Sequence, residues 1–138
     1  REGTNNLICL ADNPNQEGFQ VVCYHRSLEP MMARGRALRA EGKSPAEAFE
    51  IREAEAKAGT LDLPENPATL HVLQGPNGEY DAATASVKNA NYRYVVYIPF
   101  ATAQSTGLPT KPMVKGGPWI MDAGTHKAHI MITPPAQN

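Results

Sequence analysis

The 138-residue chain lacks several features that would assign it to a class at once. No apolar run approaches the roughly 18 residues that a transmembrane helix needs, so we predict no membrane span. Positive and negative charges nearly balance, because the chain has 13 Lys and Arg and 14 Asp and Glu, which gives a net charge of −1. This balance argues against nucleic acid or an anionic membrane as the main partner. Internal repeats and low-complexity tracts are also missing, and the length predicts a single domain over residues 1–138.

The short motifs of common enzyme classes are missing as well. The sequence contains no Gly-x-Ser-x-Gly nucleophile elbow, no His-x-x-x-His helix and no glycine loop that would cradle a phosphate. Gly116 and Gly117 precede Pro118, and we interpret them as a backbone bend rather than an anion site. No motif therefore names a reaction.

Cysteine is scarce: only Cys9 and Cys23 occur, on either side of a polar, turn-rich segment at 12–18. If the flanking segments are paired strands, a bridge between the two thiols is geometrically easy. Closing a loop of about 15 residues would add about 3 kcal/mol to the free energy of unfolding in the chain-entropy model. Two free core thiols, or thiolates that share a metal with His25, are the alternatives. A disulfide would indicate an oxidising compartment.

Hydrophobic periodicity bounded by Gly and Pro predicts seven strands, at 7–11, 19–24, 69–74, 83–87, 92–98, 119–122 and 128–133. Two helical patterns lie between the second and third of these strands. The strand 92–98 is apolar or aromatic on both faces and is expected to be central. This order predicts an α+β fold, a mostly antiparallel sheet with a two-helix insertion.

The insertion is predicted as a helical hairpin over about 28–58. Ser27 and Ser44 each precede a helical pattern as candidate N-caps, and Ser44 and Glu47 have the capping-box spacing. The first helix is basic and the second acidic, so the two arms are expected to attract each other. The alternative is that part of the basic charge forms an anion site, made of Arg34, Arg36 and Arg39.

The C-terminal segment 116–135 holds the only Trp and two of the four His, and it predicts a hairpin with a corner at Gly124. Strand alternation places His129, Met131 and Thr133 on one face and Ala128, Ile130 and Ile132 on the other. Taking the aliphatic set as the core face, we expect His129 on the opposite, functional face. His126, three residues earlier, would point away from His129 unless it lies in the turn.

Three kinds of site can be built around His129. Asp122 could orient the ring as a general base, with Tyr94 or Tyr97 nearby. His71 and Met131 could join His129 in a copper site if their strands are neighbours, although we predict no cofactor. A small-molecule pocket is the third kind, with the loop 100–115 as its cover. Its contacts would be Tyr94, Tyr97, Trp119 and His71. Satisfied core histidines, methionine as core filler and an ordinary central strand are the structural alternatives.

Both ends of the chain carry recognisable patterns. The first is Arg1-Glu-Gly-Thr-Asn5 followed by Cys9; the second runs from Gly116-Gly-Pro-Trp119 through Met121 and Ala123-Gly-Thr125 to His129-Ile-Met-Ile132. Together they resemble an exported bacterial family of no assigned function. Where that family often has Gly-Trp and Pro, this chain has Asn6-Leu7 and His126. The resemblance implies a removed secretory leader, a periplasmic or secreted location and a Cys9–Cys23 bridge, and it implies no activity.

From the sequence we therefore expect an exported, disulfide-bridged domain that binds a small molecule or a protein partner through the face that carries His129. An enzyme that uses His129 with Asp122 or a tyrosine is the second hypothesis. A copper-binding protein is the third.

Overall fold

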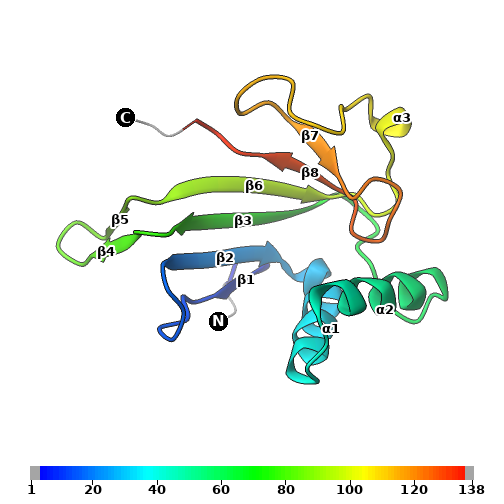
Figure 1. Ribbon diagram of the computed structural model, residues 1–138, viewed down its shortest axis with the longest axis horizontal. Helices are drawn as coiled ribbons and strands as arrows, with labels where there is room; N and C mark the ends of the chain where they lie inside the picture. Colours follow the sequence, from blue (N-terminus) through cyan, green and yellow to red (C-terminus); the bar gives the residue numbers. More distant parts are fainter. Residues whose placement is uncertain (1–3, 136–138) are drawn as a thin grey trace.

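The computed structural model describes residues 4–135, so the first three residues of the opening motif and the last three of the chain lie outside this range. Six strands form one sheet in the order β1-β2-β3-β6-β8-β7, and every neighbouring pair is antiparallel (Figure 1). Their bounds are β1 (Leu7–Leu10), β2 (Phe19–His25), β3 (Ala68–Gly75), β6 (Asn91–Tyr97), β7 (Trp119–Met121) and β8 (His129–Ile132). The predicted α+β class is confirmed.

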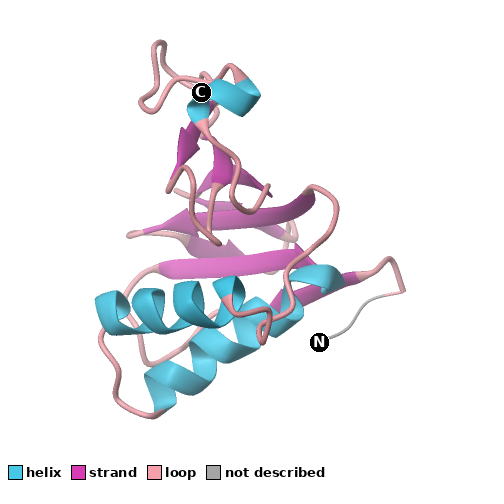
Figure 2. Cartoon of the chain, turned by 90° about the vertical axis from the view of Figure 1, so that its right-hand side faces the viewer, coloured by secondary structure: helices cyan, strands magenta, loops and turns pink. Residues whose placement is uncertain are grey.

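Two helices, α1 (Glu29–Ala40) and α2 (Pro45–Lys57), are inserted between β2 and β3, where the sequence predicted them. Figure 2 shows these two helices together at one side of the sheet, with the short α3 (Ala103–Thr106) at the other side. In the described part of the chain, none of the helices has the length and apolar character that crossing a membrane requires.

The two helices begin in different ways. At α2 the prediction is confirmed, because the Ser44 side chain accepts from the Glu47 amide while the Glu47 side chain accepts from the Ser44 amide. At α1 it is wrong: the N-cap is Leu28, which makes no side-chain cap bond. Ser27 lies instead in a 3-10 turn, η1 (Arg26–Leu28), where the His25 ring accepts from the Ser27 amide. The chain enters α1 directly from η1, so the serine side chain is not used as the helix cap.

A small ribbon of β4 (Glu79–Asp81) and β5 (Ser86–Lys88) continues the β3–β6 hairpin away from the helices (Figure 1). The sequence predicted one strand at 83–87, but residues 82–85 form the turn of this ribbon. The Asp81 carboxylate accepts from the Ala83 amide at 3.0 Å and so stabilises the turn.

Strand register divides the sheet into two faces. We call one the helix face, because α1 and α2 pack on it; its core cluster is Tyr24, Leu28, Met31, Ala68, Leu70, Val72, Val95 and Tyr97. We call the other the disulfide face. Cys9 and Cys23 are direct partners across β1 and β2, with Cα atoms 4.1 Å apart, and they form the predicted disulfide. Both cysteines are therefore bridged, and free thiols or thiolate metal ligands are excluded.

Candidate functional site

The helices leave part of the helix face uncovered, and there an open groove of about 1480 Å³ crosses the sheet. All six strands of the sheet contribute to its lining, through Leu10, Val22, Gln74, Arg93, Met131 and Trp119. One wall is the C-terminal half of α1 and another is the loop at 112–117, so the predicted loop does border the site. Ligand pockets usually enclose about 300–1,000 Å³, so this groove has room for an extended ligand.

The apolar part of the floor lies where β7 and β8 meet. Trp119 pairs directly with Met131, and Met121 is two residues along the same face of β7. The Met121 side chain is 37% exposed, so it is accessible from the groove. Unbranched thioether side chains adapt to ligands of different shape, and an indole ring offers a large rigid surface.

Positive charge gathers at the groove although the whole molecule is slightly negative. Four basic side chains line it and only two acidic ones do: Arg36, Arg39, Arg93 and Lys115 against Asp12 and Glu17. Arg93 stands in the floor, two residues from the core residue Val95 and on the same face. Its Nε is buried and has no hydrogen-bond partner, and no ion pair of Arg93 occurs within residues 4–135.

The helical arginines have separate roles. Arg34 forms a bidentate pair with Glu55 of α2, from Nε to Oε2 at 3.0 Å and from Nη2 to Oε1 at 2.7 Å, which confirms the expected attraction between the helices. Arg36 donates to the Tyr24 hydroxyl at 2.9 Å and to Glu29 at 2.6 Å. Only Arg36 and Arg39 line the groove, so the three-arginine anion site predicted as an alternative is not assembled. Positions 34 and 36 point about 200° apart around a helix, which separates them.

His129 lies on the helix face, opposite to the expectation. Its register partner is the core residue Tyr97, and its ring is 3% exposed. Alternation separates the two faces of a strand but does not say which one the helices will cover, and both faces of β8 carry apolar residues. His129 Nδ1 donates to the Lys127 carbonyl at 2.6 Å, and the ring packs 5.2 Å from that of Tyr97. Burial lowers the pKa of His129, although the Lys127 carbonyl and the charge of Asp122 oppose this.

The predicted pairing of His129 with Asp122 is not formed as a hydrogen bond. The Asp122 carboxylate instead faces Lys127, 3.2 Å from its Nζ. Tyr97 is close to His129, but burial raises the pKa of its hydroxyl to about 12. An imidazole that is almost fully buried and bonded to a backbone carbonyl is positioned to stabilise the hairpin.

His71 and His129 are on opposite faces of the sheet. His71 pairs with Cys23 and Tyr94 on the disulfide face, where its ring meets that of Tyr94 edge-on at 5.7 Å. Strand β6 also separates β3 from β8. The copper set of His71, His129 and Met131 is therefore not brought together, and the described residues contain no group of three or more His, Cys, Asp or Glu arranged to hold a metal ion.

The four predicted ligand contacts are divided in the same way. Tyr94 and His71 share the disulfide face, whereas Tyr97 and Trp119 share the helix face. Of the four, only Trp119 lines the groove. The single pocket that was expected around the central strand is thus split by the sheet itself, because Tyr94 and Tyr97 are an odd number of residues apart.

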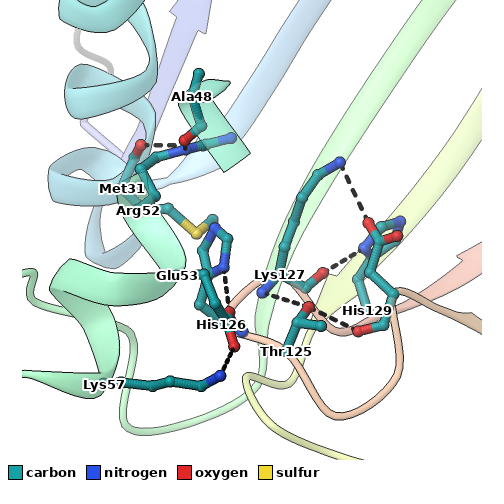
Figure 3. A network of polar contacts seen from close by, with 10 residues as sticks. Met31, Ala48, Arg52, Glu53, Lys57, Thr125, His126, Lys127 and His129 are labelled. Atoms are coloured by element: carbon teal, nitrogen blue, oxygen red, sulfur yellow. Dashed lines mark hydrogen bonds and ion pairs between the residues drawn. The ribbon is translucent and has the colours of Figure 1, made fainter. Parts of the chain in front are cut away.

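A buried polar pair joins α2 to the β7–β8 turn (Figure 3). Glu53 accepts from the His126 amide at 2.7 Å and from His126 Nδ1 at 2.6 Å, and Lys57 approaches the same carboxylate to 2.8 Å. The His126 side chain is fully buried and packs against Phe49 with ring centroids 5.0 Å apart. His126 does lie in the turn, but its partner is a carboxylate of α2 and no second histidine.

Sequence reasoning missed Arg93 and Glu53. A signal for Arg93 was present, since it is the one charged residue inside an otherwise aromatic and aliphatic strand at 92–98. Glu53 carried no such signal, because it is one of four acids on a helix that looked solvent-exposed. Comparison with known proteins identifies no relative: no family model, no curated protein and no solved structure matches the chain.

Proposed function

We propose that this protein is an exported domain that binds a small ligand in the groove on its helix face. The observation that carries the proposal is the floor of the groove, where the half-buried Trp119 and Met131 share one surface with the unpaired guanidinium of Arg93. Apolar surface with a few placed polar groups is the usual composition of a ligand site. The almost complete burial of His129 favours binding over acid–base catalysis.

Export is supported by the Cys9–Cys23 disulfide, because such bridges persist in oxidising compartments. The resemblance of both chain ends to an exported family points the same way. Fractionation of cells that express the complete gene tests this part of the proposal. We expect the protein in the periplasmic or secreted fraction with both cysteines oxidised, and a cytoplasmic protein with two reactive thiols would contradict it.

Binding can be followed through Trp119, which is the only tryptophan of the chain and lines the groove. In a small-molecule screen, a ligand at 100 times its Kd should stabilise the fold by about 2.7 kcal/mol and should also change the Trp119 emission. The Trp119→Phe variant assigns the signal to the groove: it should lose the emission change and, because the apolar floor becomes smaller, show a reduced thermal shift. A chemically broad screen that gives neither signal would refute ligand binding in the groove.

A further inference from the structure

Building on the proposed function, we infer that the ligand is an amphiphilic anion, with a carboxylate head that pairs with Arg93 and an extended apolar chain that lies over Trp119, Met121 and Met131. The groove supplies both halves of this recognition on one continuous floor. Neither half uses His71 or His129, around which the sequence predicted the site.

The head group is assigned by charge. The groove lining carries two more basic than acidic side chains, while the whole chain carries a net charge of −1. The guanidinium of Arg36 is already bonded to Tyr24 and Glu29, which leaves Arg93 as the unpaired cation of the floor, with Arg39 and Lys115 on the walls. A guanidinium without an ion pair can take a ligand carboxylate as its partner, and hydrogen bonds between charged groups are about twice as strong as neutral ones. A guanidinium fork matches a carboxylate in geometry as well as in charge.

The length of the ligand's apolar chain follows from the distance between Arg93 and the apolar part of the floor. Trp119 and Met131 lie in the same register row as Val95, and Arg93 is two residues from Val95 on β6. Two strand spacings across and two residues along place the Cα atoms of Arg93 and Trp119 about 12 Å apart. A short anion such as acetate reaches only the cation, whereas a chain of eight or more carbons spans both regions.

The test is a titration followed by Trp119 emission, with octanoate, decanoate and dodecanoate kept below their micelle concentrations. Because each buried methylene contributes a similar free energy, we expect affinity to rise about fourfold for each methylene added. The matching alcohols should bind about 10- to 100-fold more weakly than the acids, since they lack the charge-assisted hydrogen bonds. Acetate and inorganic phosphate should not compete.

Variants assign the head group to Arg93. Arg93→Gln should reduce the affinity for decanoate to that for decanol, and Arg93→Lys, which keeps the charge but loses the fork, should fall between wild type and Arg93→Gln. The control is Arg26→Gln, an exposed arginine outside the groove, which should bind as wild type does. Met121→Gln should reduce the gain in affinity for each methylene added to the fatty acid. Circular dichroism verifies that each variant is folded. If Arg93→Gln does not fold, Arg39→Gln serves as a second head-group variant.

The outcomes separate this inference from the proposed function. If alcohols bind as tightly as acids, or if Arg93→Gln and Arg26→Gln behave alike, the anionic head is wrong while ligand binding in the groove stands. Tight competition by acetate or phosphate would overturn the apolar chain. If neither these amphiphiles nor the broad screen changes the Trp119 emission or the melting temperature, the groove is not a ligand site and both proposals fail.

Discussion

At the scale of single residues, the most firmly held polar group is the buried Glu53–His126 pair. Glu53 receives two hydrogen bonds from one residue of the β7–β8 turn and an ion pair from Lys57. This turn connects the strands that carry Trp119 and Met131. The pair therefore holds the turn that joins these two strands, and neither Glu53 nor His126 lines the groove.

The same residues predict how stability depends on pH. Burial lowers the pKa of His126, more than the neighbouring Glu53 raises it, and burial also lowers the pKa of His129. Although burial opposes it, hydrogen bonds from Lys57 and His126 lower the pKa of Glu53 from 4.5 to about 2. For all three groups the folded state binds fewer protons than the unfolded state, so stability rises with pH over these ranges.

We expect the free energy of unfolding to be highest above about pH 6.5, the unfolded pKa of histidine, and to fall as the pH drops through that value. A second decrease is expected between about pH 4.5 and 2, where Glu53 stays ionised only in the folded state. Urea unfolding at a series of pH values measures both. A stability that stays level from pH 7 to pH 5 would show that neither histidine is held neutral by folding.

Replacing the carboxylate tests the pair directly. Glu53→Gln should lower the free energy of unfolding by about 2 kcal/mol, because the charge-assisted bonds to His126 become weaker neutral ones. Glu50→Gln is the matched control on the same helix, exposed, and should change stability by less than about 0.5 kcal/mol. Equal effects of the two substitutions would mean that the buried pair contributes nothing of its own.

At the scale of elements, the edge strand β1 has only four residues and one neighbour. A strand this short gains little from pairing alone, so the disulfide to β2 is expected to hold it in register. The double substitution Cys9→Ala and Cys23→Ala should lower the free energy of unfolding by about 3 kcal/mol. Hydrogen exchange should then accelerate most at residues 7–10, and a variant in which β1 stays as protected as in wild type would contradict this.

The start of α2 gives a second prediction at this scale. Ser44→Ala should cost about 1 kcal/mol of stability, because it removes the acceptor for the Glu47 amide. Glu47→Ala removes the reciprocal bond to the Ser44 amide. Since the two side chains form one capping box, the double variant should cost less than the sum of the single losses, as a double-mutant cycle in urea would reveal. Strict additivity would mean that the two caps act independently.

At the scale of the whole molecule, one continuous sheet joins the helix-covered core to the groove. The circular dichroism signal comes mainly from the helices on the core, and the fluorescence signal comes from Trp119 on β7. The Glu53–His126 pair connects α2 to the β7–β8 turn. We therefore expect far-ultraviolet circular dichroism and Trp119 fluorescence to show the same denaturation midpoint, as a single cooperative domain requires. Separate midpoints would divide the chain into two folding units.

The sequence by itself determined those features that depend on neighbours along the chain. Strand alternation, the Ser44–Glu47 cap and the turn between the two cysteines are local, so six of the seven predicted strands, the helical insertion and the pairing of the two cysteine-bearing strands followed from them. The sequence also predicted that the C-terminal hairpin carries part of the site, and the hairpin does supply Trp119 and Met131 to the groove.

Tertiary structure decided which face of the sheet the helices cover and which strands are neighbours. Alternation sorts His129 from Ile130 and His71 from Leu70 but assigns neither set to the core, because both faces of these strands are apolar enough to be buried. Covering the face of His129 sealed its ring, and placing β6 between β3 and β8 separated the histidines. The helices do not cover Arg93 and Trp119, which lie on the same face, and the groove is the part of that face that the helices leave open.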